Sequence, residues 1–169
     1  MSTTLYAQPY DLAASGFYFE SAEDYAAKAK ALQNDHGQPV EEFEIQFIDG
    51  ERIDAELAKA TGLHQGDIVA FFEKTEGWSE HDKQTIIIAV GECGYAFDWG
   101  RSDPADFDVE IYAAQSLREL AEQFVEEGLF GDVPERLQFY LDYDAIARDL
   151  GMDYAETTIA GERLVCRCG

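Results

Sequence analysis

The negative charge of this chain is spread along its whole length, and this constrains its fold more than any other feature. The 169 residues include 35 Asp and Glu against 12 Lys and Arg, a formal net charge of −23 at pH 7. Residues 1–56, 57–112 and 113–169 carry net charges of −9, −7 and −7. Repulsion between these charges opposes compaction. We therefore expect an extended molecule with carboxylates on every part, rather than a neutral domain with an acidic tail.

Aromatic side chains supply the apolar surface with which such a chain can fold. The sequence has 11 Phe, 9 Tyr and 2 Trp, and its 46% hydrophobic content is ordinary for a globular protein. This composition excludes global disorder. The longest apolar run, Ile86 to Val90, is far too short for a membrane span, and no N-terminal signal pattern is present. We expect a soluble cytoplasmic protein that makes no membrane contact.

The N-terminal third has the pattern of a small sheet with one helix. Short β-branched and aromatic runs predict strands at Thr3–Tyr6 and Gly16–Phe19. Ser21 is suited to cap a helix over Ala22–Gln33, because acids follow it at the positive end of the helix dipole. Residues Glu42–Ile48 alternate polar and apolar side chains, which is typical of a half-buried strand. Together these patterns predict an α+β unit.

The middle of the chain is predicted to be mainly helical. Glycines separate three segments of helical composition, Asp54–Ala60, Gly66–Lys74 and Ser79–Val90. The run Ile86-Ile87-Ile88 also fits a buried strand, and periodicity does not decide between the two. We predict a helix there, followed by a loop.

The C-terminal third again mixes strands and helices. Asp106–Tyr112 alternates acids with apolar residues, which predicts a strand, and Leu117–Glu127 has apolar residues at helical spacing. Pro134 is suited to the start of another helix, and Thr157–Cys166 is predicted to form a hairpin. Two helix starts have the spacing of a capping box, Ser79 with Asp82 and Ser116 with Glu119.

These elements predict an elongated α+β fold built from three small units in line. Residues 1–61 form an α+β unit, residues 62–103 a mainly helical unit, and residues 104–169 a second α+β unit.

Eight acidic side chains are predicted to lie on exposed faces, because the apolar residues that alternate with them face a core. They are Glu42, Glu44, Asp106, Asp108, Glu110, Glu119, Glu122 and Glu126. Duplex DNA presents one negative charge per ~1.7 Å of its axis, and proteins bind it largely through those charges. Carboxylates on successive exposed faces can present a comparable array. These eight are our candidates for a surface that mimics DNA.

One late segment resembles a known family. It consists of Glu127, Gly128, Leu129, Phe130, Gly131, Asp132, Val133, Pro134 and Glu135, and it is followed by Tyr140–Leu150. This segment, with the opening Leu5-Tyr6-Ala7 and the uniform acidity, resembles the ArdA antirestriction proteins. The resemblance implies an acidic mimic of duplex DNA that occupies the DNA-binding groove of type I restriction-modification enzymes and blocks them without catalysis. It also implies a homodimer formed through the C-terminal units, no cofactor and no binding to nucleic acid.

Large apolar residues after this segment suit either a dimer interface or the local core. The candidates are Leu137, Phe139, Tyr140 and Tyr143. Aromatic side chains are enriched in interfaces as well as in cores, so the sequence does not separate the two uses.

The sequence has no constellation typical of catalysis or of metal binding. His36, His64 and His81 are isolated and lack partners at metal-ligand spacing. Asp142 and Asp144 resemble paired carboxylates, but no substrate-binding motif accompanies them. The chain has no nucleophile elbow, phosphate loop or dinucleotide fingerprint. We predict a protein that is not an enzyme and that holds no metal.

Two other interpretations of the acidity stay open. A halophilic protein has an acid-rich surface with few lysines, and this chain has five. An acidic interaction module, or a chaperone for a basic nucleic-acid-binding protein, would carry a similar charge. The antirestriction-like segment favours DNA mimicry over the halophilic interpretation, which does not account for that segment.

Overall fold

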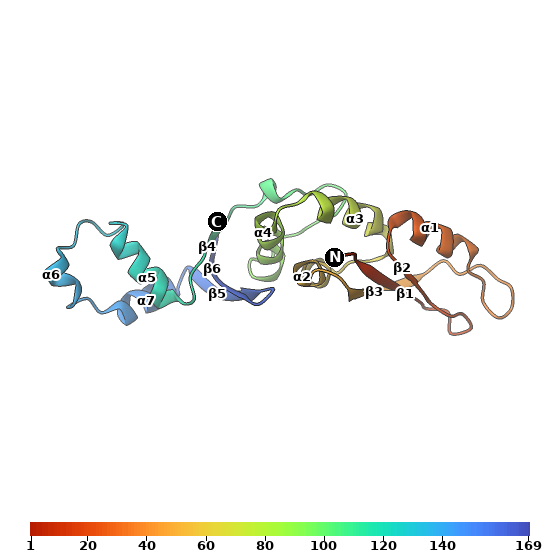
Figure 1. The fold of residues 1–169 in the computed structure, drawn as a ribbon, viewed down its shortest axis with the longest axis horizontal. Coiled ribbons are helices and arrows are strands. Elements are labelled where there is room, and N and C mark those ends of the chain that lie inside the picture. Colours follow the sequence, from red (N-terminus) through yellow and green to blue (C-terminus); the bar gives the residue numbers. More distant parts are fainter. The chain divides into compact units, whose positions relative to one another are not determined.

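The computed structural model describes all residues from Met1 to Gly169 and divides the chain into two compact units, Met1–Asp106 and Phe107–Gly169 (Figure 1). Seven α-helices accompany two three-stranded antiparallel sheets, one in each unit. The predicted α+β class is confirmed.

The sheet of the first unit has the order β2-β1-β3. It contains β1 (Thr4–Pro9), β2 (Phe17–Phe19) and β3 (Phe43–Asp49). Leu5 of β1 is fully buried and lies opposite Phe19 on one side and Phe47 on the other. Alternate residues of β3 are exposed, as the predicted period of two requires.

One face of this sheet is covered by helix α1 (Ala22–Ala31), which begins where Ser21 Oγ accepts a hydrogen bond from Asp24 N at 3.0 Å. Tyr25 brings the helix onto the sheet, and its ring centroid lies 4.9 Å from that of Phe19. Phe17 and Phe43 pack edge to face at 5.5 Å. Burial of these rings removes a large apolar area from water and supplies the main stabilisation of this part.

Three further helices complete the first unit. They are α2 (Arg52–Thr61), α3 (Ile68–Gly77) and α4 (Glu80–Gly91), with the single 3₁₀ turns η1 (Gln65–Asp67) before α3 and η2 (Pro104–Asp106) near the end. Helix α4 starts with the predicted capping box between Ser79 and Asp82. It also contains Ile86–Ile88, so the prediction of a helix for this run is confirmed.

Two contacts fix these helices against their surroundings. Asp54 of α2 and Lys83 of α4 form a buried ion pair, with Asp54 Oδ1 and Lys83 Nζ 2.6 Å apart. Trp99 is almost fully buried, stacks on Trp78 at 5.5 Å and donates a hydrogen bond from Nε1 to Thr61 Oγ1. The long loop after α4 is therefore anchored by an aromatic side chain.

The first unit contains both residues 1–61 and residues 62–103, which the sequence predicts to be separate units. Rings from the two segments lie close together, since the centroids of Phe19 in β2 and Phe72 in α3 are 6.3 Å apart. Gln65 also accepts a hydrogen bond from Phe43 N through its side-chain oxygen. A separate mainly helical unit over residues 62–103 stays a prediction.

The second unit pairs a sheet with two helices. The sheet order is β4-β6-β5, and its strands are β4 (Val109–Tyr112), β5 (Tyr154–Ile159) and β6 (Glu162–Cys168). Helix α5 (Leu117–Glu126) packs beside α7 (Tyr143–Leu150), and the short α6 (Glu135–Gln138) lies between them in the chain. The core beneath α5 consists of Ala114, Leu120, Phe124 and Val165.

The strand predicted over Asp106–Tyr112 begins only at Val109. Asp106 lies in η2 instead, because its carboxylate accepts a hydrogen bond from Asp103 N at 2.8 Å and closes a local turn after Pro104. Asp106 therefore shares no strand face with Glu110, contrary to the prediction.

Candidate functional site

The acids of the first sheet project from β3. Glu44 is exposed because its neighbours Phe43 and Ile45 turn toward the core, and Glu42, just before the strand, is exposed as well. No Lys or Arg lies within ion-pair distance of either carboxylate. Both groups therefore present unneutralised charge to the solvent.

The acids of β4 are partly neutralised within the second unit. Glu110 is exposed, but its Oε2 accepts a hydrogen bond from the hydroxyl of Tyr112 at 2.8 Å, and Arg167 Nη1 lies 3.9 Å from its Oε1. The pKa of Tyr112 is raised mainly by burial and, to a smaller extent, by this hydrogen bond to Glu110. Asp108, two residues before Glu110, is exposed. The β4 edge of the sheet therefore carries negative charge, and the nearby guanidinium of Arg167 neutralises part of it.

The three acids predicted on the outer face of α5 differ in what they contact. Glu119 is half-buried and accepts a hydrogen bond from Gln115 N, so it caps the helix. Glu122 is exposed and lies 3.4 Å from Arg118 Nε. Glu126 is exposed and has no basic partner. Glu119 therefore contributes to the helix start, as its predicted capping arrangement with Ser116 indicates, and is less exposed than Glu122 and Glu126.

The eight candidate acids are divided between the two units. Glu42, Glu44 and Asp106 belong to the first unit, whereas Asp108, Glu110, Glu119, Glu122 and Glu126 belong to the second. The eight candidates leave out several exposed acids of the first unit, among them Glu20, Glu23, Glu73 and Glu76. The three-residue spacing of Glu73 and Glu76 is a helical signal that could have identified their common face.

The antirestriction-like segment joins α5 to α6. Helix α5 ends where Leu129 N donates to Phe124 O at 2.9 Å and Gly128 adopts φ +76°. Gly131, at φ +92°, donates from its N–H to Gly128 O at 3.0 Å and reverses the chain again. Only glycine adopts such angles without strain. The turn leaves Leu129 64% and Phe130 54% exposed.

The late aromatic candidates lie outside the core of the second unit. Phe139 is 91% exposed, Tyr140 84% and Leu137 46%, while Tyr143 is half-buried at the start of α7. Residues 129–140 therefore expose five large apolar side chains: Leu129, Phe130, Leu137, Phe139 and Tyr140. We call residues 129–140 the apolar segment. Exposed apolar side chains gathered in one stretch are typical of a surface that binds another protein.

The acidic pair of the late segment has structural partners. Asp142 caps α7 by accepting a hydrogen bond from Ala145 N at 3.0 Å. Asp144 lies 2.7 Å from Arg118 Nη1 and is exposed. Neither carboxylate lies in a buried site of the kind that tunes an acid for proton transfer.

No three His, Cys, Asp or Glu side chains are grouped so that they could hold a metal ion. His64 makes local contacts, since its Nδ1 accepts from Gly66 N and its Nε2 lies 3.3 Å from Asp67. None of the helices combines the length and the apolar character needed to cross a membrane.

Comparison with known protein families gives a match. A family model described as antirestriction protein (ArdA) matches residues 16–162, which is most of the chain. The matched region includes β3, the apolar segment and α7. No curated protein matches the sequence.

Proposed function

Because the chain belongs to the ArdA family of antirestriction proteins, we propose that it inhibits a type I restriction-modification enzyme by occupying its DNA-binding groove as an acidic mimic of duplex DNA. No catalytic step is involved. The groove of such an enzyme has to bind a dense array of phosphates, and DNA releases its condensed counterions when it binds there. A surface of carboxylates can release its counterions on binding in the same way. Phosphate-like charge fixes position without any base edge being read.

One observation supports this proposal: unneutralised carboxylates project from both units. Glu42 and Glu44 do so at the first sheet, and Glu126 does so on α5. The formal charge of −23 over 169 residues supplies the strength of the field. Such a field attracts a basic groove over distances of a Debye length, about 8 Å at physiological salt.

The apolar segment supports a second part of the proposal, a homodimer formed through the C-terminal units. Phe139 and Tyr140 have no place in the core of their own unit and are exposed. A second copy of the chain would cover them in a symmetric interface, since the same patch serves both partners. Two joined copies would present twice the number of carboxylates to the enzyme.

The test is a competition assay with a type I restriction enzyme bound to labelled duplex DNA. Addition of the protein should displace DNA near stoichiometric amounts, and direct binding of protein to enzyme should weaken as salt rises. The control is a variant with all eight candidate acids changed to Gln. Displacement by the control as strong as that by the natural chain would rule out mimicry through these acids.

A folded protein that displaces no DNA at any salt concentration would point elsewhere. The alternative function, an acidic module for a basic nucleic-acid-binding protein, would then be tested by capture of basic partners. Sedimentation velocity of the natural chain and of Phe139→Ala tests the dimer separately, because self-association does not require the enzyme.

A further inference from the structure

One face of the first sheet is open to solvent. Helix α1 covers the opposite face, where Tyr25 lies against the rings of Phe19 and Phe43 (Figure 1). Because side chains alternate along a strand, the register places five residues on the uncovered face: Tyr6, Gln8, Tyr18, Glu44 and Gln46. Three of them are exposed and two, Tyr6 and Gln8, are half-buried. We call these five residues the open face.

Two tyrosines lie side by side on the open face. Tyr6 of β1 and Tyr18 of β2 are directly opposite each other, and their ring centroids are 4.8 Å apart. Tyr18 is 58% exposed. A Cβ on Gly16, just before β2, would clash with the Tyr6 hydroxyl, so the lack of a side chain there leaves room for the Tyr6 ring. The rings are therefore positioned before any partner binds, which lowers the entropic cost of binding.

The open face is negative and has no cation of its own. None of the three strands contains a Lys or Arg. Glu44 has no basic group within ion-pair distance. Lys28 of α1 donates to Tyr18 O, but its Nζ also lies 3.1 Å from Asp24 Oδ2, which compensates its charge. A partner that contacts the open face therefore meets two aromatic rings beside an uncompensated carboxylate.

Aromatic rings on an open sheet can stack on nucleobases as well as on cations, and charge decides between the two. Proteins that bind single-stranded nucleic acid by stacking also supply basic groups for the phosphates. Residues 1–106 carry 21 acids and 7 Lys or Arg, a net charge of −14, and Glu44 lies on the open face itself. Phosphates would be repelled here, so these observations favour a cationic partner that can stack.

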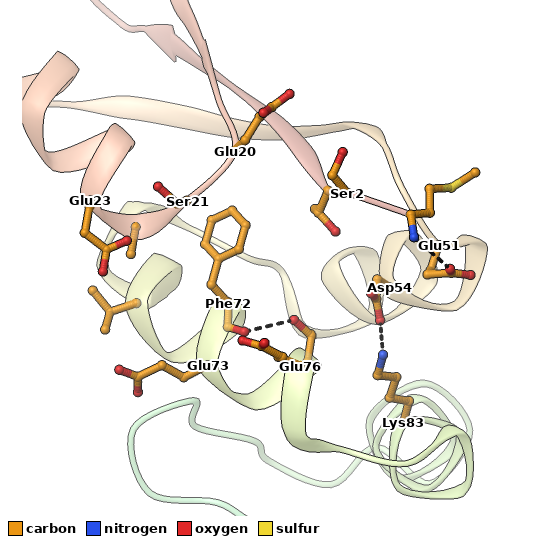
Figure 2. Close-up of a pocket in the computed structure, with 15 residues that line it drawn as sticks. Ser2, Glu20, Ser21, Glu23, Glu51, Asp54, Phe72, Glu73, Glu76 and Lys83 are labelled. Atoms are coloured by element: carbon orange, nitrogen blue, oxygen red, sulfur yellow. Dashed lines mark hydrogen bonds and ion pairs between the residues drawn. The ribbon is translucent and has the colours of Figure 1, made fainter.

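The first unit also has a pocket of about 590 Å³, and none of the five residues of the open face lines it. Its walls include the exposed acids Glu23, Glu73 and Glu76 (Figure 2). Asp54, also in the wall, is buried and already ion-paired with Lys83, 2.6 Å away (Figure 2). The pocket therefore adds negative charge to the unit, whereas the tyrosine pair belongs to the open face.

We propose that the open face is an interaction surface for an arginine side chain of a basic protein partner. The guanidinium group is planar, stacks on aromatic rings and carries five N–H donors. Gln46 is directly opposite Tyr6, with Cβ atoms about 5 Å apart, and Glu44 is the diagonal neighbour at about 7–8 Å. A guanidinium on the tyrosine pair can therefore donate to the side-chain oxygens of both. A lysine ammonium has no stacking plane, so arginine is the better match.

The inference rests on the proposed function for the identity of the partner, which is then the basic groove of the restriction enzyme. It adds a contact of defined shape to a surface that otherwise acts through distributed charge. Tyrosine and arginine are enriched among the few side chains that dominate binding at protein interfaces. Removal of one exposed ring is therefore expected to weaken binding more than removal of one exposed carboxylate.

The first test uses the full chain and short peptides. An oligoarginine peptide is titrated into the labelled protein at moderate salt while backbone resonances are followed by NMR. An oligolysine peptide of the same length and charge is titrated in parallel. The expected result is saturable shifts at β1 and β2 around Tyr6 and Tyr18, with oligoarginine bound roughly threefold more tightly than oligolysine. Shifts spread evenly over both units would overturn the open face as the site.

A single-stranded oligonucleotide serves as the third probe. The charge of the open face predicts no binding of this probe. Saturable shifts at Tyr6 and Tyr18 with the oligonucleotide would overturn the choice of partner and assign the open face to nucleic acid.

A matched pair of variants separates stacking from charge. Tyr18→Thr removes the exposed ring but keeps a residue suited to a strand, and Tyr18→Phe keeps the ring. Tyr18→Thr should weaken binding of oligoarginine roughly two- to fivefold, and Tyr18→Phe should leave it nearly unchanged. Thermal unfolding checks that both variants are folded. Equal affinities of the two folded variants would overturn the proposal.

The second test asks the same question of the enzyme. Tyr18→Thr should raise the inhibitory concentration roughly two- to fivefold relative to Tyr18→Phe. Equal inhibition by the two variants would overturn the contact between the open face and the groove and leave the proposed function intact. If the natural chain binds oligoarginine at the open face and inhibits no enzyme, the proposed function fails and the arginine-binding surface stands.

Discussion

The two units differ in how far their aromatic side chains are buried. In the first unit, Phe19, Phe71 and Trp99 are buried in one connected set of rings, while in the second unit Phe139 and Tyr140 are largely exposed. Charge does not explain this difference, since the net charges are −14 for residues 1–106 and −9 for residues 107–169. Burial of the connected rings stabilises the first unit, whereas the exposed rings of Phe139 and Tyr140 contribute little to the stability of the second unit alone.

The largest effect is expected where a buried charge loses its partner. Asp54→Ala leaves Lys83 buried without a counterion and should lower the free energy of unfolding by about 3–5 kcal/mol. Glu122→Ala in the second unit breaks an exposed pair with Arg118 and should cost less than about 1 kcal/mol. Urea unfolding measures both. A loss below that of Glu122→Ala would show that the buried pair is dispensable.

The difference between buried and exposed apolar side chains can be tested within the second unit alone. Leu120→Ala removes a fully buried side chain and should lower the free energy of unfolding by about 2–5 kcal/mol. Phe139→Ala should change it by less than about 0.5 kcal/mol in dilute, monomeric protein, because the ring is exposed. At high protein concentration the same change should weaken self-association. A large loss of monomer stability in Phe139→Ala would assign that ring to the core.

A smaller effect is expected at the start of α4. Ser79→Ala removes the cap and should cost about 1 kcal/mol. Hydrogen bonds from the backbone N–H of Ser79, and then from its hydroxyl, lower the pKa of Asp82. The stabilisation is present above the ordinary Asp value and is lost as the pH falls through the lowered pKa. The cost of Ser79→Ala should therefore shrink in acid, and thermal unfolding between pH 7 and pH 2 would show it. A cost independent of pH would exclude a contribution from Asp82.

The smallest effect is expected from a single exposed acid. Glu42→Gln should change the inhibitory concentration by less than about twofold, because exposed charges act individually weakly. Competition assays at matched salt measure it. Loss of inhibition from this one change would show that a single carboxylate, rather than negative charge distributed over both units, determines binding to the enzyme.

Several parts of the fold could be predicted because local chemistry determines them. The alternation of Phe43 and Glu44 predicts β3, and Ser79 followed by Asp82 predicts the start of α4. Helix α4 itself was ambiguous, since Lys83 and Thr85 are buried along with Ile86 and the helix has no polar face to generate a period.

Other parts depend on contacts that no local pattern contains. Asp106 was assigned to a strand because alternation cannot reveal the 3₁₀ turn closed by its own carboxylate. The capping role of Glu119 is predicted by its spacing from Ser116, but the half-buried position of this residue is not. The carboxylate-lined pocket of the first unit was not predicted, because its walls come from segments around residues 1, 20, 51 and 73 that only the folded chain brings together.

The pairing of strands also bears on how the chain is made. β1, β2 and β3 pair only with one another, and all lie before residue 50. The first sheet thus has every strand it needs long before the ribosome reaches the second unit, whose own sheet must wait for β6 to join β4 across more than 50 residues. Closing that larger loop is slower. During synthesis the N-terminal half can therefore reach its folded state while the antirestriction-like segment is still a nascent, solvated chain.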